Sequence, residues 1–577
     1  MPQTPHGINF AAHRPVVMAR NGMVCAGQPL AAQAGISILQ QGGNAVDAAI
    51  ATGAALNVVE PLMSGTGGDG FIMVYWKDAG RITIANGTGA APYAARRERY
   101  LPQGIPMKGI RSTSVPGLVH SWLDVHEKYG ALSLGQVFGP ALDLADNGFP
   151  VTHYLSRAIA SDRLLCEFPT SRAVFTRDGR PLQPGQILYQ KDLARTLQAI
   201  AEGGRDAFYR GATAAAMVQF SQEQGGLLSM KDLSDCHARW QEPISTTYQG
   251  HTVYEAPPNS SGHILLQELN LVEGFDLRSL GCNTAESVHL MVEAKKLAFI
   301  DREAYVADPD YVDVPVEGLI SKEYARERAR LIDPERAASN VPPGHPWDYQ
   351  ERKLKAAVST RTGITQEQED TTCLVVVDRW GNAVCQLQSL QSAWGSSLIA
   401  GDTGILLNNR MTYWHLEEDH VDSLQPGKRV RHTMNPVMVF KNGVPPYQSG
   451  TTGGSGHLVL VCGTPGADTQ VQTNLQVISH VLDFGMTVAE AVEAPRWKNN
   501  QSPTESNIPH VCKDELIMEG RFSEDTVNGL RRRGHQLNIL EPWDGVTGRE
   551  MMIQVDSDTG VLHGAADPRY DGYAIGW

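Results

Sequence analysis

The residue with the clearest chemical potential is a threonine that follows an aspartate at the start of an apolar run. Residues 370–373 read Asp-Thr-Thr-Cys and lead into the apolar residues 374–377. A threonine hydroxyl is a poor nucleophile at neutral pH and needs a base, which its own α-amino group supplies when the threonine begins a chain. The pattern predicts that a precursor cuts itself between Asp370 and Thr371. The alternative is an ordinary buried strand that begins with two β-branched residues.

The segments on either side of the turn 379–381 predict a second hydroxyl beside Thr371. They are typical of two antiparallel strands joined by a short turn that contains a glycine. If the strands pair symmetrically about the middle of the turn, Thr371 faces Ser389, and such partners have Cα atoms within about 5.5 Å. A register shifted by one residue would place Leu390 there instead. An ordinary strand serine is the alternative for Ser389.

Several elements must position this hairpin. An Ala-rich, largely apolar helix is predicted over 45–59 and should be buried. The glycine loop 65–70 then leads into a predicted strand, and 284–306 is predicted to be a long helix. The polar segment 358–370, which we expect to be mobile, leads into the predicted cleavage site. Beyond that site the pattern predicts mainly strands.

Length and composition describe a large globular protein. The chain has 577 residues, of which 42% are hydrophobic and 19% are charged, enough for a sizeable core. A net charge of −14 without a Lys- and Arg-rich stretch argues against a nucleic-acid partner, and no apolar run has the length of a membrane helix. The eight cysteines form no C-x-x-C pair, and residues 1–27 lack the apolar core of a secretory signal. We therefore expect free thiols and a cytoplasmic location.

The sequence argues against three other enzyme classes, which are nucleotide-binding oxidoreductases, metal hydrolases and serine hydrolases. The loop 65–70 fits the dinucleotide pattern G-x-G-x-x-G, but a predicted helix precedes it and a strand follows, which is the reverse of the required order. No H-E-x-x-H or G-x-S-x-G occurs, and His120 and His126 are not four residues apart. His289 is expected at a helix surface or core edge rather than as a ligand. We therefore expect neither a cofactor nor a metal ion.

Short segments spread along the chain resemble, in order, the γ-glutamyltransferase family of N-terminal-nucleophile hydrolases. Each segment is weak alone, but the ordered set is specific and extends from about Gly22 to the end of the chain. The matching segments are 42–49 (Gly-Gly-Asn-Ala-Val-Asp-Ala-Ala), 60–61 (Glu-Pro), 65–71, 116–117 (Pro-Gly), 257–258 with 260–262 (Pro-Pro and Ser-Ser-Gly), 293–301, 308–309 (Asp-Pro), 370–372 (Asp-Thr-Thr), 404–409, 463–466 (Gly-Thr-Pro-Gly) and 493–497 (Glu-Ala-Pro-Arg-Trp).

For the architecture, the resemblance implies an α/β fold of the αββα type, in which two stacked antiparallel sheets lie between helix layers. It implies one cut, between Asp370 and Thr371, into a large subunit, 1–370, and a small subunit, 371–577. The subunits would remain associated as one intertwined unit. The other expected partners are a small-molecule amide substrate and a water or amine acceptor, with no nucleic acid and no membrane.

For the chemistry, the resemblance implies an acyl-enzyme mechanism. Thr371 would attack an amide carbonyl and pass the acyl group to water or to an amine. Ser389 matches the family's second hydroxyl, which orients the nucleophile. Gly466 and Ala467 match the backbone N–H pair that holds the oxyanion. Ala467 replaces a usual glycine, but its N–H remains.

The residues by which the family recognises a γ-glutamyl group are changed in this chain. The arginine and the acidic residue that bind its α-carboxylate and α-amine fall on Thr88 and Tyr413, and the loss of the arginine removes a bidentate clamp on a carboxylate. A nearby glutamine becomes Arg410. Three further recognition positions also differ, and they are Gln391, His432 and Thr433.

These changes leave the substrate open. By resemblance, the first candidate reaction is hydrolysis or transfer of a γ-glutamyl amide such as glutathione. The alternative is an amidohydrolase of another substrate, a small amide such as oxamate or a β-lactam side chain, with Arg410 and His432 serving a differently placed carboxylate. A second alternative is a self-processed relic that no longer turns over.

Overall fold

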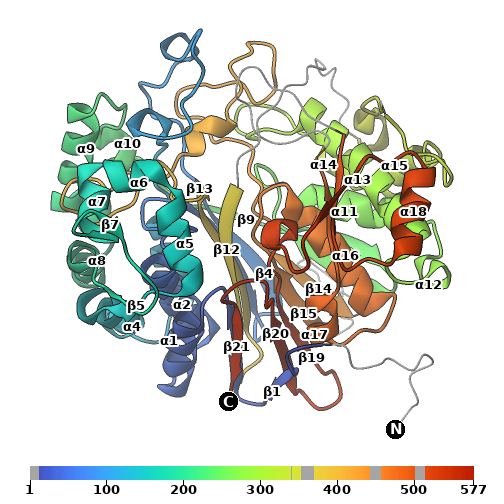
Figure 1. Ribbon diagram of the computed structural model, residues 1–577, viewed down its shortest axis with the longest axis horizontal. Helices are drawn as coiled ribbons and strands as arrows, with labels where there is room; N and C mark the ends of the chain where they lie inside the picture. Colours follow the sequence, from blue (N-terminus) through green and yellow to red (C-terminus); the bar gives the residue numbers. More distant parts are fainter. Residues whose placement is uncertain (1–11, 340, 352–368, 442–455, 501–513) are drawn as a thin grey trace.

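Two seven-stranded sheets lie face to face between two groups of helices (Figure 1), which is the predicted αββα arrangement. The computed structural model describes residues 12–577 except 340, 352–368, 442–455 and 501–513. Of Glu369 and Asp370 it describes the backbone only. Nearly all of the segment 358–370, which we expected to be mobile, therefore lies outside the described residues.

The sheet that carries Thr371 is antiparallel, and the predicted hairpin forms β12 and β13 near its centre. The strand order is β21-β2-β12-β13-β3-β4-β9. In chain order the strands are Gly22–Ala26 (β2), Asp69–Trp76 (β3), Arg81–Gly87 (β4), Arg239–Gln241 (β9), Glu369–Asp378 (β12), Ala383–Ser392 (β13) and Tyr573–Gly576 (β21). The predicted cut lies inside β12, after its second residue. Because β2, β3, β4 and β9 precede the cut and β13 and β21 follow it, the two halves of the chain share this sheet.

The second sheet is also antiparallel, with the order β1-β20-β19-β15-β14-β11-β10. In chain order the strands are Val17–Ala19 (β1), Ile244–Tyr248 (β10), His251–Glu255 (β11), Val437–Lys441 (β14), His457–Gly463 (β15), Met551–Val555 (β19) and Leu562–Ala566 (β20). It faces the first sheet across a core that both sheets supply. Both sheets therefore combine strands from before and after the predicted cut.

One group of helices covers the outer face of the first sheet, at the left of Figure 1. It contains Pro29–Gln40 (α1), Ala45–Val59 (α2), Leu118–Tyr129 (α3), Leu134–Asn147 (α4), His153–Ser161 (α5), Arg163–Glu167 (α6), Pro169–Phe175 (α7), Lys191–Tyr209 (α8), Ala212–Glu223 (α9) and Met230–Ser234 (α10). The predicted helix 45–59 is confirmed as α2, which is buried along its length and begins with a capping box at Asn44. It ends before the glycine loop that leads into β3, so the helix-loop-strand order expected from the sequence is confirmed.

The other group of helices covers the second sheet, at the right of Figure 1. It contains Gly262–Val272 (α11), Leu277–Leu280 (α12), Ala285–Tyr305 (α13), Val316–Leu319 (α14), Lys322–Ala329 (α15), Thr469–Leu482 (α16), Val488–Glu493 (α17) and Glu524–Arg532 (α18). The long predicted helix 284–306 is confirmed as α13. The short remaining strands are Phe149–Pro150 (β5), Thr176–Arg177 (β6), Arg180–Pro181 (β7), Ile187–Leu188 (β8), Trp497–Asn499 (β16), Leu516–Glu519 (β17) and Leu537–Leu540 (β18).

Alternation along β12 gives the hairpin two different faces. Cys373, Val375 and Val377 pack into the core between the sheets, whereas Leu374 and Val376 pack toward the helices α1 and α2. Both faces are apolar because the strand is covered on both sides. The alternation also decides which polar residues at the open end of the hairpin point between the sheets.

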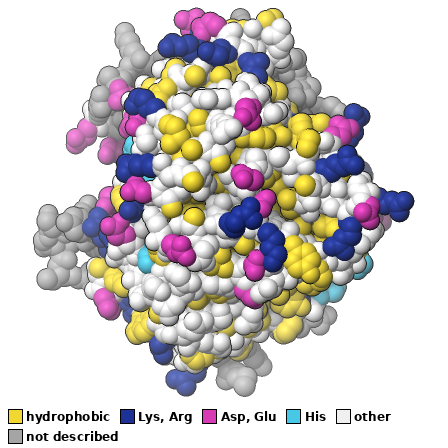
Figure 2. All heavy atoms as spheres, turned by 90° about the vertical axis from the view of Figure 1, so that its left-hand side faces the viewer, with side chains coloured by type: hydrophobic (Ala, Val, Ile, Leu, Met, Phe, Trp, Pro, Cys, Tyr) yellow, Lys and Arg dark blue, Asp and Glu magenta, His cyan; other side chains and the backbone are white. Residues whose placement is uncertain are grey.

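The helical face at the left of Figure 1 carries acidic and basic side chains in a mixed pattern (Figure 2). Ion pairs there include Arg163–Glu167, Arg195–Asp192 and Lys191–Asp146. Charges of both signs alternate over this face, so it has no single-sign field. Among the described residues, no helix combines the length and apolar character needed to cross a membrane.

Candidate active site

The β12–β13 hairpin has the predicted register over most of its length. From Cys373 to Val377, each residue of β12 pairs with the partner that symmetry about the turn requires. Toward the open end the register shifts by one between Asp370 and Thr372, which places a β-bulge at Thr371. Bulges disrupt a ladder locally and often lie next to active sites, where they redirect a side chain.

The bulge leaves two residues of β13, Ser389 and Leu390, opposite the single residue Thr371. The serine hydroxyl is the group that meets the threonine, with 3.2 Å between Thr371 Oγ1 and Ser389 Oγ. Ser389 Oγ also accepts a hydrogen bond from the backbone N–H of Gln391, at 2.8 Å. Thr371 is 2% exposed and Ser389 is fully buried. The predicted proximity of the two hydroxyls is therefore confirmed.

A carboxylate on the next strand extends this row of polar residues. Asp69, the first residue of β3, pairs with Ser389 across the β3–β13 ladder and is fully buried. Phe71, two residues along β3, packs between the sheets, so Asp69 lies on the inner face as well. From the sequence, Asp69 was noted only as part of longer segments, the dinucleotide-like loop 65–70 and the family-matching segment 65–71. The signal it missed was a lone acidic residue where a glycine loop enters a buried strand.

Two predicted recognition residues, Arg410 and His432, converge on Asp69. Arg410 Nε lies 3.0 Å from Asp69 Oδ2, and His432 Nε2 lies 3.5 Å from the same oxygen. Burial alone would raise the pKa of Asp69, but the hydrogen bond with His432 and the charge of Arg410 hold it below its usual value. Burial and the Arg410 charge lower the pKa of His432 to about 4, so its ring is neutral at neutral pH.

The other predicted recognition residues lie at different positions around this cluster. The Arg410 guanidinium is stacked 4.8 Å from the centroid of the Tyr413 ring. Thr88 donates its hydroxyl to Asn86 rather than to the cluster. Gly89, its neighbour, donates a backbone N–H to Asp69 at 2.9 Å. Thr88 is therefore the neighbour of a residue that bonds Asp69.

Gln391 lies two residues after Ser389 and Thr433 directly follows His432, but in the part of the chain that the structure describes neither forms a hydrogen bond with Asp69. Gln391 has a φ of 93°, and among the described residues its buried side-chain amide has no hydrogen-bond partner at either end. Thr433 follows His432 and its backbone carbonyl accepts a bond from Asn435. The structure thus brings Arg410, Tyr413 and His432 together, leaves Gln391 beside Ser389, and gives Thr433 a backbone role.

Residues on the helix side hold the open end of the hairpin in place. Thr372 donates its hydroxyl to Glu60 at 2.7 Å, and Arg549 lies 3.6 Å from the other oxygen of that carboxylate. Gln388 donates from its amide to Asn57 at 3.0 Å. These residues were not predicted as site residues, although Glu60 belongs to the Glu-Pro segment noted in the sequence.

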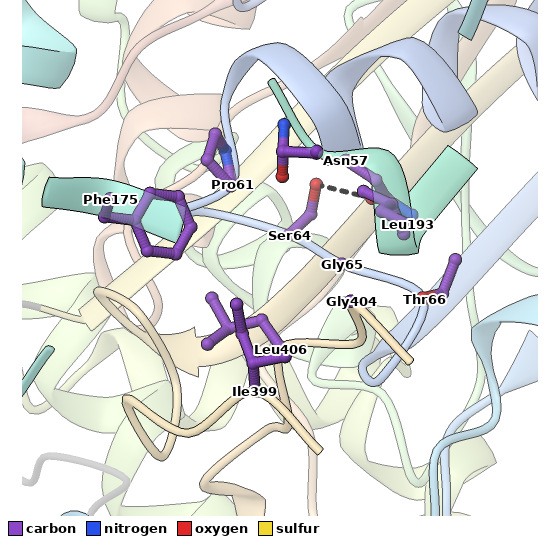
Figure 3. A pocket seen from close by; sticks show the side chains of 11 residues that line it. Asn57, Pro61, Ser64, Gly65, Thr66, Phe175, Leu193, Ile399, Gly404 and Leu406 are labelled. Atoms are coloured by element: carbon purple, nitrogen blue, oxygen red, sulfur yellow. Dashed lines mark hydrogen bonds between the residues drawn. The ribbon is translucent and has the colours of Figure 1, made fainter. Parts of the chain in front are cut away.

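A small cavity lies beside these supporting residues (Figure 3). Asn57, Ser64, Thr66, Phe175 and Leu406 are among its lining residues, and Ser64 donates a hydrogen bond to Asn57. Its volume is about 10 Å³, enough for about one water molecule. Because its polar residues contact the outer face of β13, this cavity is distinct from the hydroxyl pair on the inner face.

The predicted oxyanion turn lies between β15 and α16. Gly466 and Ala467 both have positive φ, 119° and 47°, and the Thr469 N–H donates to the Gly466 carbonyl at 2.8 Å. Gly463, at the end of β15, packs so closely on β12 that an added Cβ would lie 2.8 Å from the Cys373 sulfur. The turn therefore begins beside the strand that carries Thr371.

Within the described residues, two groups of histidine and glutamate side chains are close enough to hold a metal ion. In each group the carboxylate already faces a cation, because Lys296 lies 3.0 Å from Glu293 and Arg431 lies 2.9 Å from Glu303. A metal ion would have to displace these cations, so we assign neither group as a metal site. The groups are His289 with Glu293 and His535, and Glu303 with His415 and His420.

The gamma-glutamyltranspeptidase family model matches residues 31–577. The "Glutathione hydrolase-like YwrD proenzyme" of Bacillus subtilis is 38% identical over 97% of this chain and 99% of its own. The "Oxamate amidohydrolase proenzyme" of Klebsiella pneumoniae is 31% identical over 99% of this chain and all of its own. A solved cephalosporin acylase from Bacillus halodurans is 34% identical over all of this chain and 99% of that chain, with a TM-score of 0.85.

The chain therefore belongs to the gamma-glutamyltranspeptidase family, with the N-terminal-nucleophile hydrolase fold. It is an amide hydrolase or acyltransferase. Several relatives carry the word proenzyme in their names, which implies processing into two subunits. The matched relatives include glutathione hydrolases, acylases and an oxamate amidohydrolase, so membership alone does not choose the substrate.

Proposed function

We propose that Thr371 is the nucleophile and that cleavage of the Asp370–Thr371 bond activates it. The observation that carries the proposal is the 3.2 Å contact between the Thr371 and Ser389 hydroxyls at a β-bulge. An ordinary strand threonine would continue the ladder, whereas here the pairing shifts at that residue. The products would be the subunits 1–370 and 371–577.

Cleavage would proceed through attack by the Thr371 hydroxyl on the Asp370 carbonyl carbon. The hydroxyl proton passes to the departing amide nitrogen, which leaves an ester between the two residues and a free α-amino group on Thr371. Water then hydrolyses the ester, which gives a C-terminal α-carboxylate on Asp370 and restores the Thr371 hydroxyl. Thr371 is 2% exposed in the uncut chain, so separation of the two new ends would open the site to substrate.

Turnover would then use the new α-amino group as the base. It takes the Thr371 hydroxyl proton as the oxygen attacks a substrate amide, and it returns a proton to the leaving amine. Ser389 would orient the nucleophile through the hydrogen bond between the hydroxyls. The N–H groups of Gly466 and Ala467 would hold the oxyanion. Water or an amine acceptor then removes the acyl group from Thr371.

For the substrate, we propose an amide whose acyl half carries a carboxylate. Arg410 is 1% exposed, and its Nη2 has no hydrogen-bond partner among the described residues. Its Nε donates a hydrogen bond to Asp69, which fixes the orientation of the guanidinium group and leaves Nη2 as a donor for a ligand. This supports small anionic amides over γ-glutamyl amides, because Thr88 and Tyr413 offer no charge for an α-carboxylate or α-amine. Glutathione remains the candidate that family membership suggests.

A substrate panel tests this choice. We expect the processed enzyme to hydrolyse oxamate or its longer ω-amide homologues faster than γ-glutamyl anilide. Arg410→Lys keeps a positive charge beside Asp69 but loses the planar guanidinium fork. KM for the anionic amide should therefore rise roughly 10-fold to 100-fold. The matched neutral amide, in which the carboxylate is replaced by a carboxamide, should show little change. Faster turnover of γ-glutamyl anilide than of every small amide would contradict the substrate proposal.

A further inference from the structure

The oxyanion turn, Gly466 and Ala467, has a backbone conformation that must be stabilised by contacts with other segments. Ala467 has a φ of 47°, in the left-handed region that residues with a Cβ rarely adopt, and it follows Gly466 at 119°. Such conformations persist only where surrounding contacts determine them. The residue that follows, Asp468, is the N-cap of α16, yet its side chain makes no capping bond to that helix. Its carboxylate is therefore engaged elsewhere.

That carboxylate is held by Arg302, near the C-terminal end of α13. Arg302 Nη1 lies 2.5 Å from Asp468 Oδ1, and Nη2 lies 3.4 Å from Oδ2, which is a forked contact. The arginine side chain is fully buried, so salt and water screen this pair only weakly. The position of the oxyanion turn is thus tied to one guanidinium in the neighbouring helix.

The next residue on α13, Glu303, holds a second segment in place, the one that contains Arg431. Its carboxylate lies 2.9 Å from Arg431 Nη2 and 3.1 Å from Arg302 Nη2. Arg431 is fully buried and immediately precedes His432, which contacts Asp69 beside the hydroxyl pair. Burial would raise the pKa of Glu303, but the Arg431 and Arg302 charges and the hydrogen bond with His420 hold it well below its usual value.

We propose that Arg302 and Glu303 are positioning residues that hold the oxyanion turn and the segment 410–432 in register with Thr371. The proposal rests on the proposed function of Thr371 and of the Gly466 and Ala467 N–H groups. Neighbouring residues of one helix bind two segments that are far apart in the sequence. Both segments follow the proposed cut and α13 precedes it, so the two ion pairs also join the proposed subunits.

Three isosteric or charge-retaining variants test the pairing in the processed enzyme. Asp468→Asn should lower kcat by roughly 10-fold to 100-fold with little change in KM, because oxyanion N–H groups act mainly in the transition state. Glu303→Gln should mainly raise KM, because it releases the segment that carries Arg410 and His432. Arg302→Lys should do both, since a lysine cannot contact the two carboxylates through a planar fork.

A surface network of the same form provides the matched control. Arg205 on α8 also bridges two acidic side chains, at 2.5 Å from Asp124 and 2.6 Å from Glu127. Arg205→Lys should leave kcat and KM unchanged. Wild-type kinetics in Asp468→Asn and Glu303→Gln would overturn the proposal, and so would equal losses of kcat in the Arg205 and Arg302 variants.

The readouts separate this proposal from the one on which it rests. Intact mass shows whether each variant is cut, and thermal unfolding shows whether it is folded. If the wild type is cut and active while the positioning variants match it, only the positioning role fails. If Thr371→Ala retains hydrolysis, the proposed function itself fails. A split between kcat in Asp468→Asn and KM in Glu303→Gln is an outcome that general loss of stability does not produce.

Discussion

The two ends of the β12–β13 hairpin are made from the same strands but differ in how their polar groups are satisfied. At the turn, Asp378 accepts hydrogen bonds from the backbone N–H groups of Ala45, Trp380 and Asn382, and from the Asn382 amide, all at 2.9–3.0 Å. At the open end, the ladder is broken by a bulge, and the Gln391 amide has no partner among the described residues.

This difference separates a structural end from a reactive end. The turn has regular pairing and a fully used carboxylate that also joins the hairpin to the N-terminus of α2. The open end retains an irregular backbone and unused donors, which are features that proteins retain where function requires them. The comparison predicts that variants at the two ends affect different properties, turnover at one and stability at the other.

The largest effect is expected from Thr371→Ala. The variant lacks the hydroxyl that attacks both the peptide bond and the substrate, so it should remain uncut and lose at least about 10³-fold in kcat/KM. Thr371→Ser keeps a hydroxyl and an α-amino group and should be cut, more slowly. Mass spectrometry and amide hydrolysis measure both properties. Normal turnover by the alanine variant would show that Thr371 is not the nucleophile.

Ser389→Ala should have the next largest effect. The Thr371 hydroxyl would lose its 3.2 Å partner but keep its own base, so processing and kcat should each slow by roughly 10-fold to 100-fold. The time course of cleavage and steady-state kinetics measure the two rates. Unchanged rates in both would mean that the contact between the hydroxyls has no part in the reaction.

Asp378→Asn should change stability instead of turnover. The asparagine has one acceptor oxygen for the four bonds that Asp378 now accepts, so the free energy of unfolding should fall by about 1–3 kcal/mol. Urea unfolding measures this loss, and kcat of the processed enzyme should stay near the wild-type value. A large loss of kcat without a loss of stability would contradict the division between the two ends.

The last effect is confined to acidic pH. Burial and Arg410 lower the pKa of His432 to about 4, whereas an unfolded histidine titrates near about 6.5. The unfolded chain therefore binds one more proton between these values, and stability is lost as pH falls through this window. His432→Gln should make the decline in unfolding free energy less steep, because the variant lacks the one proton that the unfolded chain binds at this position. An identical pH profile in the variant would contradict a neutral buried His432.

The hairpin and its hydroxyl pair could be predicted because they follow from local pattern. A period of two and a glycine-containing turn fix the register, and the register places Ser389 near Thr371. The bulge could not be predicted, because the backbone of Leu390 bonds outside the hairpin, to the Met63 carbonyl and the Asn409 N–H. Those partners come from loops that are remote in the sequence.

The charged cluster could be predicted only in part. Arg410, Tyr413 and His432 were noted because they replace expected residues, and the structure brings the three together. Asp69 was missed as the common partner of Arg410 and His432, since it lies 341 residues from Arg410 and 363 residues from His432. Arg302 and Glu303 likewise act through residues from other parts of the chain. A single sequence carries no local signal for such long-range contacts.

The central claim is that this chain becomes an enzyme by cutting itself before Thr371. Its most direct test is the intact mass of the purified protein under denaturing conditions, with N-terminal sequencing of each fragment. We predict two fragments, the smaller beginning at Thr371, and one uncut chain in Thr371→Ala. A wild-type chain that stays intact at 62.8 kDa after long incubation, or a fragment that begins at another residue, would contradict the account.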